Sequence, residues 1–290
     1  MNLELNVVFR TYPGYNLKKA LKAFPTKELL IKYTLPSLIS QLDQKKSKLH
    51  IIIDSPTEEY ILIIKEIISR FPIKSYLHIQ EKPYGNAESF RSCLLLANSF
   101  EDSKIFFCED DYLIHPCLFK QIDKVFLEKD PPEYLFPFFH PDYSRLFIHK
   151  FYRVLTFFSK SSDSYKRRAS GCLTFFTTKD ILSRDYYAFN FYANGLLGDH
   201  NMWKLLTLPY ISFSSIIKEL YKNHYHSNNS LKDLFILLSK KKRSQVASLN
   251  TSLALHLAND CLPINYNSFY DINDPNLFQT EYNKLDLMLK

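Results

Sequence analysis

Residues 105–116 read IFFCEDDYLIHP, an apolar run that leads directly into three consecutive carboxylates. The four residues IFFC have the composition of a short buried β-strand. Glu109, Asp110 and Asp111 then follow at the carboxyl end of that strand. Because the ligand site of an open α/β sheet lies outside the carboxyl ends of its strands, we expect this acidic cluster to face a ligand.

The chain before residue 109 alternates between short strand patterns and longer helical patterns, which is typical of parallel β-α units. We expect strands over residues 5–10, 49–53, 75–80 and 104–108, and helices over 27–42, 58–71 and 86–100. Beyond residue 117 we expect helices over 118–127 and 248–259 and from residues 180 and 199, strands over 134–139, 153–158 and 171–177, and a polar loop over 159–169. No repeat or linker divides the chain, so the sequence predicts one α/β domain over residues 1–290.

Glycine is scarce: the chain has five, at positions 14, 85, 171, 195 and 198. Their spacing excludes both a dinucleotide fingerprint and a Walker P-loop. The net charge of +7 is modest, and outside residues 166–168 and 240–243 the basic residues are scattered, which suits an acidic ligand or membrane surface without requiring nucleic acid.

The five cysteines form no C-x-x-C pair and have no zinc spacing, which indicates reduced core residues. The first twenty residues lack a signal-peptide pattern, and no apolar stretch reaches the roughly 18 residues that a membrane span needs. We therefore expect a cytoplasmic protein that does not cross a membrane.

Three adjacent carboxylates repel one another and ionise most easily beside a cation. Hard oxygen ligands at a strand end suit Mg²⁺ or Mn²⁺, which completes its coordination shell with water and substrate phosphate oxygens. A solvated acidic turn after the strand is the alternative interpretation of the same three residues.

The apolar strand, the E-D-D sequence and the following apolar residue and proline resemble the DxD-type metal motif of GT-A glycosyltransferases, family 2-like members in particular. Further matches occur in that family's order at 10–11, 54–55, 85–87, 171–175 and 198–203. The resemblance implies a Rossmann-like α/β/α fold with a mostly parallel central sheet and an added antiparallel portion on the acceptor side. Within one domain, it implies a nucleotide-sugar-binding half over 1–115, an acceptor-binding half over 116–226 and a C-terminal helical extension and tail over 227–290.

The same resemblance implies a metal-dependent transfer of a sugar from a nucleoside-diphosphate sugar, a UDP-sugar first among them, to a hydroxyl of a glycan or other acceptor. Asp111 would be the direct ligand of Mn²⁺ or Mg²⁺, and a histidine near the end of the fold, His226, would be the second. Asp199 would be the general base, and a single base implies inversion at the anomeric carbon. Asp199 could also cap the helix that follows it, and both roles are compatible.

The remaining implied contacts divide between donor and acceptor. Donor contacts would come from strand ends and one helix start: Arg10, Thr11, Asp54, Gly85, Asn86, Glu109 and Asp110. Acceptor contacts would come from Gly171, His200 and Trp203, the last offering an aromatic face for a sugar.

Two basic tracts allow further interpretations. Lys166, Arg167 and Arg168 could close on the diphosphate as a lid or form an ordinary solvated charge run. Residues 231–238 with the basic tract 240–243 have the pattern of a helix at a membrane surface, so peripheral membrane contact stays open, as does a core helix with a solvated end.

Two other functional classes also stay open. One is a sugar-nucleotide nucleotidyltransferase, although the Gly-rich loop expected after its first strand is missing from residues 10–14. The other is a non-enzymatic basic module for polyanions or nucleic acid, which would need base-stacking aromatics within a basic stripe.

Overall fold

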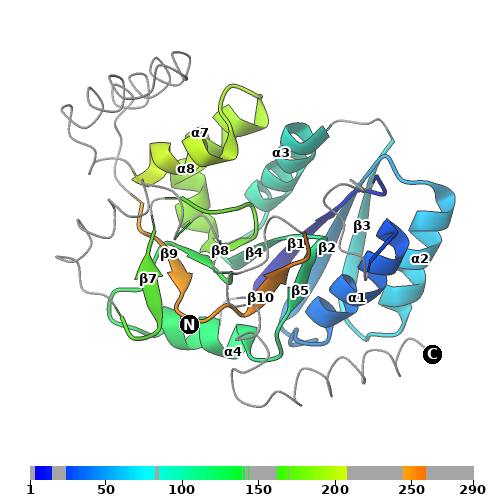
Figure 1. The fold of residues 1–290 in the computed structure, drawn as a ribbon, viewed down its shortest axis with the longest axis horizontal. Helices are drawn as coiled ribbons and strands as arrows, with labels where there is room; N and C mark the ends of the chain where they lie inside the picture. Colours follow the sequence, from blue (N-terminus) through cyan, green and yellow to red (C-terminus); the bar gives the residue numbers. More distant parts are fainter. Residues whose placement is uncertain are drawn as a thin grey trace.

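The structure is a computed structural model, and it describes residues 4–14, 24–81, 85–138, 140, 143, 162–168, 170–207 and 244–258. Its centre is an eight-stranded mixed sheet in the order β3-β2-β1-β4-β8-β6-β9-β7, accompanied by a two-stranded sheet of β5 and β10 (Figure 1). The fold class expected from the sequence, a mixed α/β fold with a mostly parallel central sheet and added antiparallel strands, is confirmed.

The strands are β1 (Leu5–Thr11), β2 (Ser47–Asp54), β3 (Lys74–Gln80), β4 (Lys104–Glu109), β5 (Tyr112–Ile114), β6 (Tyr134–Phe136), β7 (Tyr165–Arg167), β8 (Phe175–Thr178), β9 (Val246–Leu249) and β10 (Ala254–His256). The helices are α1 (Lys27–Ile39), α2 (Glu58–Ser69), α3 (Gly85–Asn98), α4 (Leu118–Phe126), α7 (Lys179–Ala193) and α8 (Asp199–Thr207).

The first half of the sheet follows the predicted β-α alternation closely. β1 pairs in parallel with both β2 and β4, and β2 pairs in parallel with β3. Local capping fixes where the helices begin: the Thr57 hydroxyl accepts a hydrogen bond from the Tyr60 N–H at 3.2 Å, at the start of α2. The four strands and three helices expected before residue 110 are all present, with ends shifted by at most three residues.

The second half of the sheet is mixed, and here several expectations are wrong. The 248–259 segment, expected as a helix, contributes instead to the strands β9 and β10, because short apolar runs such as VASL fit either state and tertiary pairing decides between them. Residues 244–258 therefore belong to the two sheets rather than to a helical extension. The polar loop expected over 159–169 contains β7, which pairs with β9.

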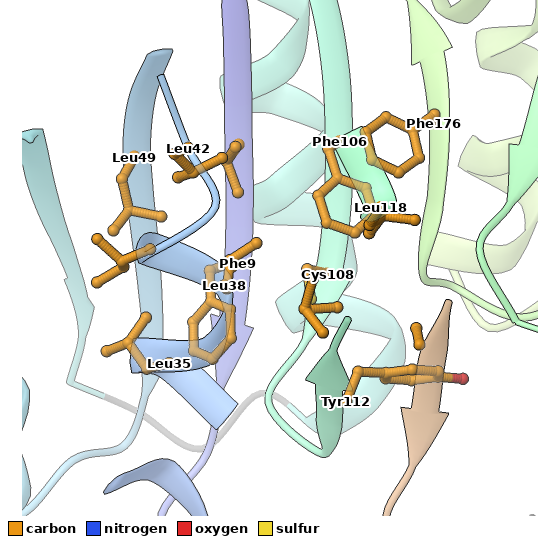
Figure 2. Packing of buried hydrophobic residues seen from close by; sticks show 14 of the residues in the cluster. Phe9, Leu35, Leu38, Leu42, Leu49, Phe106, Cys108, Tyr112, Leu118 and Phe176 are labelled. Carbon is orange, nitrogen blue, oxygen red and sulfur yellow. The ribbon is translucent and has the colours of Figure 1, made fainter. Parts of the chain in front are cut away.

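Helices cover both faces of the central sheet. One buried cluster packs the sheet against α1, α2 and α4, and a second packs it against α3, α7 and α8, as the two groups of helices in Figure 1 show. Alternate residues of β4 join alternate clusters: Phe106 and Cys108 the first, Ile105 and Phe107 the second. Because both of its faces are buried, the strand is apolar throughout. Figure 2 shows Phe106 against Phe176, whose ring is stacked at a centroid distance of 3.8 Å.

Strand directions bring the loops that matter to one edge of the sheet. β8 is antiparallel to both β4 and β6, and β9 is parallel to β6, so β1, β2, β3, β4, β6 and β9 all point the same way. Their carboxyl ends form what we call the carboxyl edge, where the acidic cluster lies. Within the described residues, no helix is both long and apolar enough to cross a bilayer.

A buried histidine provides a test of the parallel half of the sheet. His50 of β2 stacks on Tyr76 at a centroid distance of 4.8 Å, and its Nδ1 lies 3.4 Å from Nε2 of His78. Burial, together with the positive charges of His78 and Lys48, lowers the pKa of His50 from 6.5 to about 4.

We therefore predict that acid destabilises the fold through His50. The unfolded chain binds a proton on His50 at a higher pH than the folded chain does. The stabilising contribution of neutral His50 is therefore fully present above pH 6.5 and is lost as the pH falls towards 4. The expected loss in free energy of unfolding is roughly 2–3 kcal/mol, measured by urea denaturation, and His50→Phe should remove most of it. An NMR titration of His50 with a pKa near 6.5 would contradict the prediction.

Candidate functional site

The acidic cluster at the carboxyl edge is held by three basic side chains, one for each carboxylate. Arg10 comes from β1, Lys27 from the start of α1 and His256 from the end of β10. Because these three side chains differ in burial and in their other contacts, the three acids have different environments.

Glu109 pairs with Arg10. An Nη2–Oε1 distance of 2.5 Å joins them, and Arg10 Nη1 donates to the carbonyl of Asn86 at 2.6 Å, which connects the pair to the first turn of α3. The Glu109 N–H donates to the Thr174 hydroxyl at 3.0 Å. Burial raises the pKa of Glu109, although Arg10 opposes that shift. Both residues thus fasten β4 to its neighbours, and the Arg10 guanidinium is directed into the protein.

Asp110 lies at the centre of a buried polar network. Lys27 Nζ lies 2.5 Å from its Oδ1, while its Oδ2 accepts from the Thr11 hydroxyl at 2.5 Å and from the Tyr12 N–H at 3.1 Å. The Thr11 hydroxyl lies 2.6 Å from the hydroxyl of Tyr60. Burial and the nearby Asp110 charge raise the pKa of Tyr60, which keeps its proton available for this contact.

Asp111 has a different environment. Its Oδ2 lies 3.0 Å from Nε2 of His256, and its backbone carbonyl accepts from the Leu257 N–H at 2.7 Å. The other carboxylate oxygen, Oδ1, is buried and has no hydrogen-bond partner among the described residues. Burial opposes ionisation, but the attraction of His256 outweighs it and lowers the pKa of Asp111. These interactions favour the ionised form of Asp111, whose Oδ1 has no hydrogen-bond partner among the described residues.

His256 is held in place by its own neighbours. The Tyr112 hydroxyl lies 3.3 Å from its Nδ1, and the two rings stack at a centroid distance of 4.5 Å. These contacts orient Nε2 towards Asp111. Sequence reasoning missed His256 because residues 248–259 were interpreted as a helix, and nothing within that segment indicates a partner 145 positions away. His226 lies outside the described residues.

The residues fit a divalent metal in part. Among the residues that the structure describes, no group of three or more histidine, cysteine, aspartate or glutamate side chains could hold a metal ion. Asp111 and His256 nevertheless provide an imidazole and a carboxylate side by side, and the buried Asp111 Oδ1 lacks a partner. A cation that keeps several water or phosphate ligands needs few protein ligands, so this pair satisfies its minimum requirement.

The other donor-side residues also lie at the carboxyl edge. Asp54 is buried at the end of β2 and accepts from the Ser55 hydroxyl at 3.0 Å. Ser55 has a φ of 48°, and its N–H donates to the Gln80 carbonyl at 2.8 Å, which fixes the tight turn after β2. Gly85 and Asn86 open α3, where backbone N–H groups favour an anion.

The acceptor-side expectations are altered by packing. Trp203 is fully buried and contacts the rings of Phe175 and Phe189, so it presents no face to a ligand, and the expected stacking role is wrong. Gly171 has a packing reason, because a Cβ there would overlap the ring of Phe136. His200 lies in α8, and nothing further is described for it.

Asp199 is the first residue of α8 and is exposed. Burial raises the pKa of Cys172 and of Tyr192, and the charges of Glu109 and, to a smaller extent, Asp199 add to both shifts. Asp199 and the acidic cluster are therefore electrostatic neighbours.

Gly195 ends α7: it has a φ of 70°, its N–H donates to the Tyr192 carbonyl and the next N–H donates to the Phe191 carbonyl.

Of the two basic tracts, only the first, residues 166–168, lies within the described residues. Residues 165–167 form β7, and Arg168 is buried with its Nε donating to the Ser248 hydroxyl at 2.7 Å, so a lid made by 166–168 is wrong. The 231–243 tract and the expected strand over 153–158 lie outside the described residues.

The packing of Gly171 yields a testable prediction. Gly171→Ala should lower the free energy of unfolding by about 1–3 kcal/mol because the new methyl group meets the Phe136 ring. Adding Phe136→Leu should relieve part of that cost, so the double variant should lose less than the sum of the two single variants. Gly198→Ala is the matched control, since nothing lies within 4 Å of a Cβ at that position. Equal losses for Gly171→Ala and Gly198→Ala in urea denaturation would contradict the packing role.

No protein-family model matches the chain, and no curated protein matches its sequence. Among solved structures, S. aureus TarS 1–349 in complex with UDP matches 70% of this chain and 54% of its own, at 11% identity and a TM-score of 0.45. Another structure of TarS 1–349 is matched over about a third of its length, 34%.

Two further solved structures match the chain over 46% and 86% of its length. Mannosyltransferase PcManGT from Pyrobaculum calidifontis, in complex with GDP-Man and Mn²⁺, matches 46% of this chain and 34% of its own, at 12% identity and a TM-score of 0.36. The inositol-1-phosphate CTP transferase from T. maritima matches 86% of both chains, at 12% identity and a TM-score of 0.36.

Proposed function

We propose that this chain is a metal-dependent glycosyltransferase of the GT-A type, which moves a sugar from a nucleoside-diphosphate sugar to a hydroxyl acceptor. The observation that carries the proposal is the Asp111–His256 pair at the carboxyl edge, with a buried Asp111 oxygen that has no partner within the described part of the chain. An ionised carboxylate beside an imidazole is a suitable ligand pair for Mn²⁺ or Mg²⁺.

Asp111 and His256 would hold the metal, so His256 would take the role that the family resemblance implied for His226. The bound cation would neutralise negative charge on the leaving nucleoside diphosphate. Glu109 and Asp110 act differently: their cations are within the protein, and they fix the turn that presents Asp111.

The donor would lie along the carboxyl edge. Asp54, at the end of β2, would accept hydrogen bonds from a ribose or a base, and the N-terminal amides of α3 at Gly85 and Asn86 would bind a phosphate. Arg10 and Thr11 would act on the donor through Glu109 and Asp110, which they bind. A UDP-sugar is the first donor to test.

Asp199 would be the general base, because it is an exposed carboxylate in the electrostatic neighbourhood of the acidic cluster. It would remove the proton of the attacking acceptor hydroxyl on the face of the sugar opposite the diphosphate. One base acting in a single displacement inverts the anomeric centre. A glycan is the natural class of acceptor for such a group.

We predict Mn²⁺-dependent hydrolysis of one member of a panel of UDP-, GDP- and dTDP-sugars. Asp111→Asn and His256→Gln should each lower that rate by roughly 10²-fold or more, since each removes a ligand from the cation that stabilises the leaving group. Asp123→Asn is the matched control: its exposed carboxylate pairs with Lys104, at the opposite end of β4. The rates would be measured by release of the nucleoside diphosphate.

Asp199→Asn separates transfer from binding. It should abolish transfer to an added acceptor while leaving the rise in melting temperature with Mn²⁺ and nucleoside diphosphate unchanged. Full transfer by both Asp111→Asn and Asp199→Asn would sink the assignment. Release of pyrophosphate from a nucleoside triphosphate and a sugar phosphate would show a nucleotidyltransferase instead.

A further inference from the structure

Lys27 is a buried cation that no sequence pattern singled out. It is the first residue of α1, whose start is fixed by the Thr26 hydroxyl, which accepts from the Leu29 N–H at 3.2 Å. Its side chain is 9% exposed, and its ammonium group lies 2.5 Å from Asp110 Oδ1. A buried lysine that contacts a residue 83 positions away joins the start of α1 to the end of β4.

Both oxygens of Asp110 are engaged within the protein. Lys27 takes Oδ1, and the Thr11 hydroxyl and Tyr12 N–H take Oδ2. Asp110 itself is 7% exposed. Its neighbour Asp111 keeps one oxygen without a partner among the described residues. The two adjacent aspartates are therefore unequal: a metal that bound Asp110 would have to displace an ammonium group from a buried carboxylate.

We infer that Lys27 is a positioning residue that withholds Asp110 from the metal and so confines the cation to Asp111 and His256. The inference rests on the proposed metal site. Its physical basis is competition between the Lys27 ammonium group and the metal ion for the same Asp110 carboxylate. Lys27 already binds that carboxylate, and it belongs to a helix that is packed in the core. Lys27 also places a positive charge near the incoming metal, which lowers the affinity further.

The test is Mn²⁺ affinity in the absence of any donor, measured by electron paramagnetic resonance of free Mn²⁺. Lys27→Met should bind Mn²⁺ about tenfold more tightly, because a second carboxylate becomes available and a positive charge is removed. Lys27→Arg, which keeps a positive charge beside Asp110, should bind Mn²⁺ with the same affinity as the unaltered protein. A purely structural lysine would predict equal or weaker binding in Lys27→Met.

The double variant Lys27→Met/Asp110→Asn is the matched control. It removes both charges of the pair together, so Mn²⁺ affinity should return to within about twofold of the unaltered protein. This variant also guards against misfolding, because a buried carboxylate left without its cation is destabilising whereas an amide is not charged. If Lys27→Met fails to fold, Lys27→Gln, which keeps a donor for Asp110, should still bind Mn²⁺ severalfold more tightly.

Asp111→Asn distinguishes failure of this inference from failure of the proposed function. Loss of Mn²⁺ binding in Asp111→Asn with no gain in Lys27→Met or Lys27→Gln would overturn the role of Lys27 alone. Unchanged Mn²⁺ binding in Asp111→Asn would overturn the metal site itself, and the role of Lys27 with it.

Discussion

The carboxyl edge of this fold depends on one electrostatic requirement: three consecutive carboxylates at the end of one strand must each find a basic partner. Asp110 is buried, and Glu109 and Asp111 are only partly exposed, so water alone does not separate their charges and the compensation comes from the chain itself. Arg10, Lys27 and His256 supply it from sequence separations of 99, 83 and 145 residues. Meeting that requirement connects β1, α1 and β10 to β4, and it brings the last described segment into the site.

The three pairs differ in what they leave available for chemistry. Glu109 and Asp110 are paired with Arg10 and Lys27, whose side chains are buried. Arg10 also contacts the start of α3, and Asp110 accepts a hydrogen bond from Thr11 at the end of β1. Asp111 faces the imidazole of His256, a group that can bind either a metal ion or a carboxylate. Asp111 also keeps a buried oxygen that has no hydrogen-bond partner within the described residues. In the proposed site, two of these three similar acids are structural and the third is the metal ligand.

Local pattern was sufficient to predict the parallel half of the sheet, because β1, β2 and β4 are largely buried apolar runs and α1 and α2 each begin at a threonine whose hydroxyl caps the helix. It was sufficient to select the acidic cluster as well. It did not predict β9, β10 or β7, whose three or four residues are too short to distinguish strand from helix without their partners. Lys27 and His256 were missed for a related reason: a pairing across 83 or 145 residues leaves no local trace. The acceptor-stacking role predicted for Trp203 was wrong because the sequence does not distinguish an aromatic ring that stacks on a sugar from one that is buried in the core.

The central claim is that the acids are divided between internal cations and a single metal ligand, and anomalous diffraction at the manganese edge tests it most directly. Crystals soaked with Mn²⁺ and a nucleoside diphosphate should show one peak at coordination distance from Asp111 and His256, with Lys27 still on Asp110 and Arg10 still on Glu109. A peak shared between Asp110 and Asp111 with Lys27 displaced, or a peak remote from all three acids, would contradict it.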